Sequence, residues 1–205
     1  MTISLNQVSK RYQSHWILKG IDYTFEAGMQ YAILGANGSG KSTLLRAVAG
    51  MQDINKGKID YTLNGKPVKP EHVYRHISYC APGMDLVEEL TLEEFLKFHF
   101  SFKAIRKGYG IDSMIDEMGL QQAAGKFIHE FSSGMKQRVK LAQAFFSDTP
   151  VLLLDEPCSN LDLAGVEMYL QWLRDHTAGR LVIVASNDER EYDGISRLLQ
   201  VTDYK

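Results

Sequence analysis

The stretch GANGSGKST, residues 35–43, holds the residues whose types and spacing most clearly predict chemistry. It fits the pattern G-x-x-x-x-G-K-[ST], in which glycines let successive backbone N–H groups surround phosphate oxygens because no Cβ blocks the approach. The lysine of the pattern reaches the β- and γ-phosphates, and the hydroxyl after it ligates Mg²⁺. The residues expected to contact a nucleotide here are Gly35, Asn37, Gly38, Gly40, Lys41, Ser42 and Thr43.

A second stretch, VLLLDEP at residues 151–157, supplies carboxylates. Its aliphatic run predicts a buried strand that delivers Asp155 to the carboxyl edge of a sheet, where ligands bind in open α/β folds. We expect Asp155 to ligate Mg²⁺ together with Ser42, either directly or through a water. Glu156 is suited to polarise a water that attacks a phosphate. Together the two stretches predict hydrolysis of a nucleoside triphosphate, with Glu156 and Lys41 as catalytic residues.

Short apolar runs predict the strands that must position these residues. The runs are residues 2–8, 21–25, 29–34, 58–63, 76–80, 151–155, 181–186 and 197–201. The runs 29–34, 151–155 and 181–186 are nearly continuous, which is typical of strands buried on both faces of a parallel sheet. The run 29–34 leads directly into the glycine-rich stretch, as the phosphate-binding pattern requires.

Helical patterns separate the predicted strands. They cover residues 41–49, 91–102, 111–118, 133–147 and 162–176. Thr91 with Glu94 three residues later forms a capping-box pattern, and Gly50 is suited to end the first helix. Strands and helices alternate at both ends of the chain, whereas the middle is mostly helical. We therefore expect one domain over 1–205, with an α/β core (1–82 and 132–205) and a helical subdomain (83–131) inserted into it.

Composition and charge exclude several classes of protein. The 205 residues suit one domain with an insertion, and the net charge of −2 provides no basic field for nucleic acid. No apolar run has the length of a membrane span, and the N-terminal residues lack the apolar core of a signal peptide. Cys80 and Cys158 predict two reduced thiols, and the histidines show no metal-ligand spacing. We expect a cytosolic protein.

The order of the motifs resembles that of the nucleotide-binding subunits of ATP-binding cassette (ABC) transporters, and the resemblance covers nearly the whole chain. GANGSGKST is similar to the family's Walker A motif and VLLLDE to its Walker B motif. SNLD (159–162), just after Walker B, is similar to the D-loop. The resemblance implies a P-loop NTPase core with a mixed sheet flanked by helices and an antiparallel β edge. It also implies that Tyr12, after the first strand, stacks on adenine.

The segment FSSGMKQR (131–138) resembles the family's signature motif, with Ser133 in place of a glycine and Met135 in place of a glutamine. Its serines open a predicted helix whose N-terminus is suited to bind an anion. In the family this helix end meets the γ-phosphate of ATP bound to the opposite subunit. The resemblance therefore implies that Ser132 and Gly134 contact ATP.

Two positions depart from the family's pattern. Where the family has a glutamine that senses Mg²⁺ and the attacking water, this chain has Pro82, which offers no side-chain carbonyl. Where the family has a switch histidine, this chain has Asn187. An asparagine amide donates a hydrogen bond to a γ-phosphate oxygen but carries no proton or charge near neutral pH. Losing a charged or well-placed donor commonly costs about 2–4 kcal/mol of transition-state stabilisation, so we expect Asn187 to be a catalytic residue of lowered effect.

The resemblance implies an ATP-hydrolysing subunit that forms a homodimer or heterodimer around ATP and Mg²⁺ and drives separate integral membrane subunits. Such a protein lies in the cytoplasm, peripheral to the inner face of the cell membrane. Pro82 and Asn187 keep open a nucleotide-sensing module whose hydrolysis is slow or depends on a partner. A third alternative is a non-transport member of the family that acts on ribosomes or DNA, but the charge of −2 does not favour it.

Overall fold

The computed structural model describes residues 1–205. The chain forms two compact units. Unit 1 comprises residues 1–79, 149–156 and 178–205, and unit 2 comprises residues 80–148 and 157–177. Unit 2 thus contains residues 83–131 together with two helices, 133–145 and 163–175, that the sequence analysis assigned to the α/β core. No helix of the chain combines the length and the apolar character needed to cross a membrane.

Unit 1 contains an antiparallel sheet with the strand order β2-β1-β4-β5. Its strands are β1 (Thr2–Tyr12), β2 (His15–Phe25), β4 (Lys56–Leu63) and β5 (Lys66–Val68). β1 and β2 are longer than expected because register shifts, with Gln7 at a φ of 51°, let their pairing continue past the apolar runs. β5 was missed by the sequence analysis, although Asn64-Gly65, both at positive φ, is a turn sequence typical of hairpins.

The second sheet of unit 1 has the strand order β6-β7-β8-β3-β9. Its strands are β3 (Gln30–Leu34), β6 (Ile77–Cys80), β7 (Val151–Asp155), β8 (Leu181–Ala185) and β9 (Arg197–Gln200). β7, β8, β3 and β9 pair in parallel, and every residue of β7 and β8 is buried, which confirms the predicted buried parallel strands. Ala185 pairs with Asp155 on one side and with Ile33 on the other, so three strands end at one edge of the sheet.

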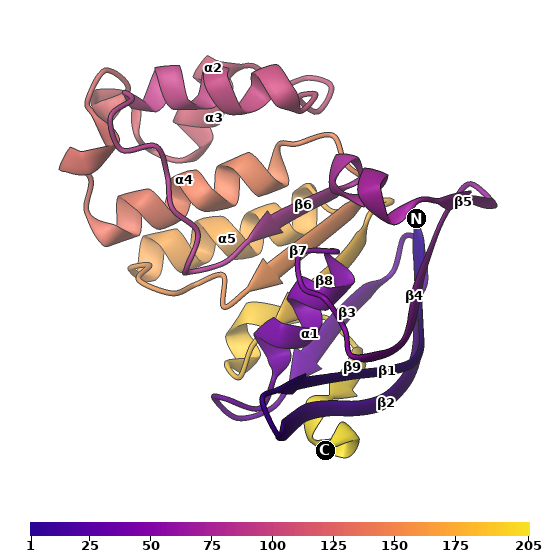
Figure 1. Cartoon of the computed structure of the whole chain (residues 1–205). Coiled ribbons are helices and arrows are strands. Elements are labelled where there is room, and N and C mark those ends of the chain that lie inside the picture. The colour runs from indigo at the N-terminus through magenta and orange to yellow at the C-terminus, as the bar shows by residue number, and fades with distance from the viewer. The chain divides into compact units, whose positions relative to one another are not determined.

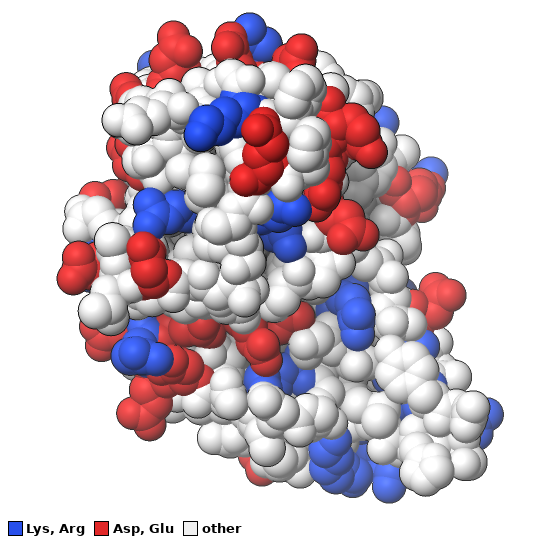
Figure 2. All heavy atoms as spheres, turned by 90° about the vertical axis from the view of Figure 1, so that its left-hand side faces the viewer, with Lys and Arg blue, Asp and Glu red and all other residues white.

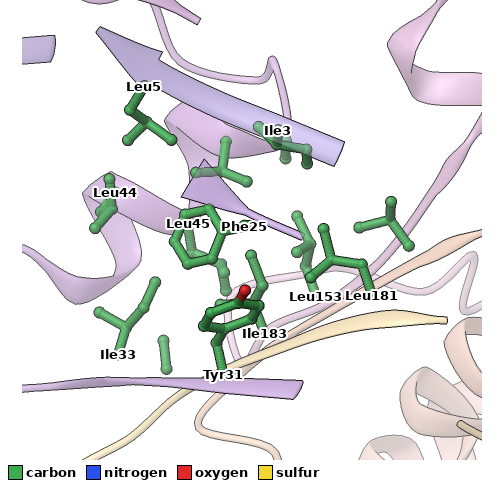
Figure 3. Packing of buried hydrophobic residues seen from close by; sticks show 14 of the residues in the cluster. Ile3, Leu5, Phe25, Tyr31, Ile33, Leu44, Leu45, Leu153, Leu181 and Ile183 are labelled. Carbon is green, nitrogen blue, oxygen red and sulfur yellow. The ribbon is translucent and has the colours of Figure 1, made fainter. Parts of the chain in front are cut away.

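The core of unit 1 lies between its two sheets and α1 (Lys41–Val48). Figure 3 shows Leu5 and Phe25 of the antiparallel sheet facing Tyr31 and Ile183 of the parallel sheet, and Leu44 of α1 also belongs to this cluster. Fully burying an aliphatic or aromatic side chain contributes about 1.5–3 kcal/mol. This packing fixes the sheet edge from which the loop before α1 emerges (Figure 1).

Unit 2 is helical. Its helices are α2 (Leu92–Phe102), α3 (Ile111–Glu117), α4 (Ser133–Phe145) and α5 (Leu163–Asp175). The predicted capping box is confirmed, because Thr91 Oγ1 accepts the Glu94 N–H and the Glu94 carboxylate accepts the Thr91 N–H. α4 packs against α5, where Phe145 of α4 and its C-cap residue Phe146 meet Trp172 of α5.

Short 3₁₀ turns complete the chain. They are η1 (Pro70–Arg75), η2 (Gln121–Ala123), η3 (Ile128–Glu130), η4 (Glu189–Tyr192) and η5 (Val201–Tyr204). The first helix ends as expected, since Gly50 has a φ of 71° and its N–H donates to the carbonyl of Ala47. Every strand and helix that the sequence analysis predicted is present, and the predicted and observed bounds differ mainly at the ends of the elements.

Candidate nucleotide site

The loop between β3 and α1 is curled by glycines in the left-handed region. Gly35, Gly38 and Gly40 have φ values of 148°, 76° and 107°. A Cβ on Gly35 would lie 2.5 Å from the Ser39 hydroxyl oxygen, and one on Gly40 would lie 2.7 Å from a methyl carbon of Ile17. Only glycine fits these two positions without displacing a neighbour. The loop therefore has the conformation that directs successive N–H groups inward.

Lys41 begins α1 and spans the loop with its side chain. Its Nζ donates to the carbonyl oxygens of Gly35 at 2.8 Å and Ala36 at 3.4 Å, and the residue is only 4% exposed. The N-cap position of α1, Gly40, has no side chain to accept the first N–H groups of the helix. Unsatisfied N–H groups at a helix N-terminus favour an anion. A buried ammonium and an uncapped helix end therefore meet at one place.

Ser42 and Asp155 come together although they are far apart in the sequence. The Ser42 hydroxyl donates to Asp155 Oδ1 at 2.9 Å. Asp155 ends β7 and is 5% exposed; burial raises the pKa of its carboxyl, while the hydrogen bond from Ser42 opposes that rise. One hydroxyl and one carboxylate oxygen are hard ligands of the kind that Mg²⁺ prefers. The donor set fits a magnesium ion whose other ligands are phosphate oxygens and water.

Glu156 lies in an unusual backbone conformation. Its φ is 44°, in the left-handed region that a residue with a side chain rarely adopts. Its N–H donates to the carbonyl of Ala185 at 2.9 Å, so the neighbouring strand β8 holds the turn after β7 in place. Strained residues of this kind cluster at functional sites. Glu156 lines the same pocket as Lys41 and Ser42.

Asn187 follows β8 and is joined to the loop between β3 and α1, residues 35–40, which we call the phosphate loop. Its Nδ2 donates to the side-chain oxygen of Asn37 at 3.3 Å. The parallel pairing of β7 with β8 places this strand beside the strand that ends in Asp155. The end of β8 is therefore tied to the loop through two side-chain amides.

A pocket of about 330 Å³ collects most of the predicted residues in unit 1. It is lined by Tyr12, Ile17, Asn37, Gly38, Gly40, Lys41, Ser42, Thr43, Arg46 and Glu156. Tyr12 is 43% exposed and its hydroxyl donates to Gln52 Oε1 at 3.0 Å. The sequence analysis missed Ile17 and Arg46. The spacing of Arg46, four residues after Ser42 on a helix, was a usable signal, because residues so spaced share a face.

A second pocket, in unit 2, contains the two predicted signature residues. Its lining includes Ser132, Gly134, Arg138 and Asp162. Ser132 is the N-cap of α4, where its Oγ accepts the Met135 N–H at 3.2 Å. A Cβ on Gly134 would lie 3.0 Å from the backbone oxygen of Asn160, so the start of α4 and the segment before α5 approach closely.

Arg138 and Asp162 hold the second pocket together. An Arg138 nitrogen lies 2.8 Å from Asp162 Oδ1, which also accepts the Gly165 N–H at 2.8 Å. These contacts, first the backbone hydrogen bond and then the guanidinium, hold the pKa of Asp162 below its usual range. The basic side chain that lines this pocket is thus already paired.

The position of Pro82 is stabilised through its backbone. Lys140 Nζ donates to the Pro82 carbonyl oxygen at 2.8 Å. Glu88, six residues later in the same unit, forms an ion pair with Lys136 at 2.6 Å. Both lysines belong to α4, so α4 restrains the segment in which the family's glutamine would lie.

Charged side chains are mixed over the surface. Figure 2 shows lysines and arginines interspersed with aspartates and glutamates over the face that it presents. The net charge is −2. A surface of this kind provides no extended single-sign field on that face.

Comparison with known proteins gives consistent matches. The family model described as ABC transporter matches residues 18–159. An uncharacterised ABC transporter ATP-binding protein of Bacillus subtilis (strain 168) is 31% identical over 196 residues, covering 92% of this chain and 87% of that protein. The sulfate/thiosulfate import ATP-binding protein of Synechococcus elongatus is 34% identical over 176 residues, covering 84% of this chain. This chain spans only 51% of that relative's length.

The fold also matches solved structures. A dimeric ATP-binding cassette in a post-hydrolysis state, bound to ADP and phosphate, superposes with a TM-score of 0.83. The match covers 97% of this chain and 93% of that chain, at 22% sequence identity. The predicted mixed α/β fold with a P-loop NTPase core is therefore confirmed.

Proposed function

Because the chain belongs to the ABC transporter family of ATP-binding proteins, it is an ATP-binding ATPase subunit of that class, and we propose which of its residues bind and hydrolyse ATP. The observation that carries the proposal is the 2.9 Å contact between Ser42 Oγ and Asp155 Oδ1. It joins the phosphate loop to the acidic strand end, beside the buried ammonium of Lys41. Phosphates then bind to the loop N–H groups and to Lys41, and adenine stacks on Tyr12.

Ser42 and Asp155 would hold Mg²⁺, because their two oxygens already lie within contact distance of each other. A bound Mg²⁺ neutralises negative charge on the β- and γ-phosphate oxygens. Phosphate oxygens and water would complete the coordination of the ion. Loss of either ligand is expected to weaken ATP binding only when Mg²⁺ is present.

Glu156 is proposed to act on the attacking water. Its carboxylate lines the pocket and its backbone is fixed by the hydrogen bond to Ala185. The Glu156 carboxylate takes a proton from the water, whose oxygen forms a bond to the γ-phosphorus. The bond from that phosphorus to the β,γ-bridging oxygen breaks, and ADP and inorganic phosphate leave. Lys41 stabilises the developing charge on the phosphoryl oxygens. Asn187 donates its amide N–H to the same group, with less effect than a charged donor.

Ser132 and Gly134 are proposed to complete the site of a second subunit. They line a pocket of their own in unit 2, at the N-terminus of α4. A second copy of this chain or a paralogue would bring this pocket to the γ-phosphate of ATP. The closed pair is proposed to drive separate integral membrane subunits from the cytoplasmic face of the cell membrane.

Slow or partner-dependent hydrolysis is the second candidate, and two contacts favour it. The Asn187 amide is engaged with Asn37, and the Pro82 carbonyl is engaged with Lys140. Neither position offers an ionisable side chain to the reaction. On this alternative ATP binding still closes the dimer, while turnover awaits a more complete partner subunit.

The steady-state ATPase rate of the purified chain, beside that of Glu156→Gln, tests the proposal. We expect the variant to bind ATP normally and to lose about 10²–10⁴-fold in rate, the usual contribution of general acid–base catalysis. Glu167→Gln, a substitution in α5, is the matched control and keeps the wild-type rate. Equal rates for the wild type and Glu156→Gln would exclude Glu156 as the base in the isolated subunit.

A further inference from the structure

Lys205 approaches the phosphate loop from a side that the motif does not describe. Its Nζ donates to the backbone carbonyl oxygen of Ser39 at 2.5 Å. Ser39 belongs to the loop, but the pocket is lined by its neighbours Gly38 and Gly40 and not by Lys205. We propose that Lys205 is a positioning residue for nucleotide binding, acting through the Ser39–Gly40 peptide. The inference rests on the proposed role of this loop in binding ATP.

The segment that carries Lys205 is anchored in the core of unit 1. Val201, the first residue of η5, is fully buried in the same cluster as Leu44, and Tyr204 packs against that cluster. Val201 also lies next to the loop, since one of its methyl carbons is 3.6 Å from the place of a Cβ on Gly40. Lys205 is therefore presented to the loop by a short element with a fixed position.

The geometry of the Ser39–Gly40 peptide links the contact of Lys205 to the orientation of the Gly40 N–H. The Ser39 carbonyl and the Gly40 N–H belong to one planar trans peptide, in which the two groups point in opposite directions. Lys205 binds the carbonyl from outside the pocket lining, while Gly40 lines the pocket. The contact therefore holds the Gly40 N–H toward the space where phosphates are proposed to bind.

The charge of Lys205 adds to this effect. An ammonium on a carbonyl oxygen polarises the peptide, which makes its N–H a stronger donor, and hydrogen bonds with an ionised partner are about twice as strong as neutral ones. Few other contacts restrain Ser39: its N–H donates to the Ala36 carbonyl at 3.0 Å, and its buried hydroxyl has no protein partner. Ser39 lies between Gly38 and Gly40, whose φ values of 76° and 107° are in the left-handed region that favours glycine. Lys205 thus adds a charged restraint to the loop at Ser39.

Lys205→Met tests the proposal, because methionine keeps most of the apolar stem and removes the donor. The dissociation constant of the fluorescent analogue mant-ATP is measured in the Glu156→Gln background, where the nucleotide is not consumed. We expect a rise of about 5- to 20-fold, less than a fully buried charged hydrogen bond would give, because the contact is partly exposed. In the otherwise native chain KM for ATP rises by a similar factor, while kcat changes by less than about two-fold, as loss of ground-state positioning requires.

Two further variants make the result specific. Lys205→Arg retains a charged donor and is expected to restore the dissociation constant to within about two-fold of the parent value. Lys66→Met, an exposed lysine of β5, is the matched control and leaves it unchanged. Weaker binding in Lys205→Met that arginine does not restore would overturn the proposal, as would an unchanged constant. If the parent chain itself does not bind mant-ATP, the proposed function fails instead.

Discussion

Two helix N-termini in this chain are built for anions in different ways. α1 begins after Gly40, which has no side chain, so the N–H groups of its first turn are left for a ligand, and Lys41 adds a buried ammonium. α4 begins after Ser132, whose hydroxyl already accepts the Met135 N–H, and the nearby Arg138 is paired with Asp162. The N–H groups of the first helical turn are therefore without a side-chain cap in α1 of unit 1, whereas those of α4 in unit 2 are partly satisfied by Ser132.

The difference indicates a division of labour. A helix end with free N–H groups, a lysine and a metal-ligating pair binds a triphosphate by itself. A helix end that is capped by its own serine has fewer groups to offer, so it binds only a phosphate that is already held elsewhere. This matches the proposed arrangement, in which unit 1 holds ATP and unit 2 contacts ATP on a second subunit.

Removing the ammonium of unit 1 is expected to have the largest effect on this comparison. Lys41→Ala leaves the loop carbonyls of Gly35 and Ala36 without their donor and removes the charge proposed to bind phosphate. We expect ATPase activity to fall by about 10²–10³-fold, as for other lost charge-stabilising donors, and mant-ATP binding to weaken strongly. Arg138→Ala in unit 2 is the control, because binding of mant-ATP to the isolated chain does not depend on it. Equal loss of binding in both variants would contradict the division of labour.

Asn187→His is expected to act on turnover within unit 1, by up to about 100-fold in rate, because it supplies a donor that carries a proton. ATP binding changes little, since Asn187 contacts the loop only through Asn37 at 3.3 Å. The measurement is kcat and KM for ATP, with Asn187→Gln as the control that lengthens the amide without adding charge. An unchanged kcat in Asn187→His would move the cause of slow hydrolysis to the position of Pro82.

Local sequence patterns were sufficient for most of the elements and for most of the residues that line the pocket of unit 1. The buried strands 151–155 and 181–186 are aliphatic throughout, and the loop needs glycine at fixed positions, so periodicity and spacing predict both. The contact of Ser42 with Asp155 followed from parallel strands that end at one sheet edge.

Other features depend on tertiary contacts that no local pattern encodes. Glu156 has a left-handed φ, and its N–H donates to Ala185 of the neighbouring strand. The contact of Lys205 with Ser39 joins residues 166 positions apart. The extension of β1 depends on register shifts rather than on hydrophobic alternation. Each of these requires the fold before it can be seen.

Acid is expected to destabilise unit 2 through His99. The ring stacks on Phe95 and lies 3.3 Å from Ser147 Oγ, and burial lowers its pKa to about 4 from an ordinary value of 6.5. Between those two values the unfolded chain binds a proton that the folded chain does not, so stability falls as the pH falls through this window. After allowance for the partial exposure of the ring, we expect a loss of about 1–2 kcal/mol between pH 7 and pH 5.

His99→Gln removes this titration and is expected to flatten the pH dependence, measured as the urea midpoint at pH 7 and pH 5. His129→Gln, which replaces an exposed histidine of the same unit, is the control and keeps the wild-type slope. A slope that is unchanged in His99→Gln would show that acid acts elsewhere. The result sharpens the comparison because His99 lies in unit 2, whereas the phosphate loop and Asp155 lie in unit 1.

Ser132→Ala is expected to have the smallest effect on stability and the most specific effect on function. Loss of the N-cap acceptor for the Met135 N–H costs about 1 kcal/mol. Ser133→Ala, one residue into the helix, is the control, since alanine is favourable there. Because Ser132 lines only the pocket of unit 2, mant-ATP binding to the isolated chain stays at the wild-type level, while ATPase activity at concentrations that permit dimerisation falls. Weaker nucleotide binding to the isolated Ser132→Ala chain would contradict the proposed division, in which α1 binds ATP and α4 completes the ATP site of a second subunit. In that case α4 would have to contact the nucleotide bound by its own subunit.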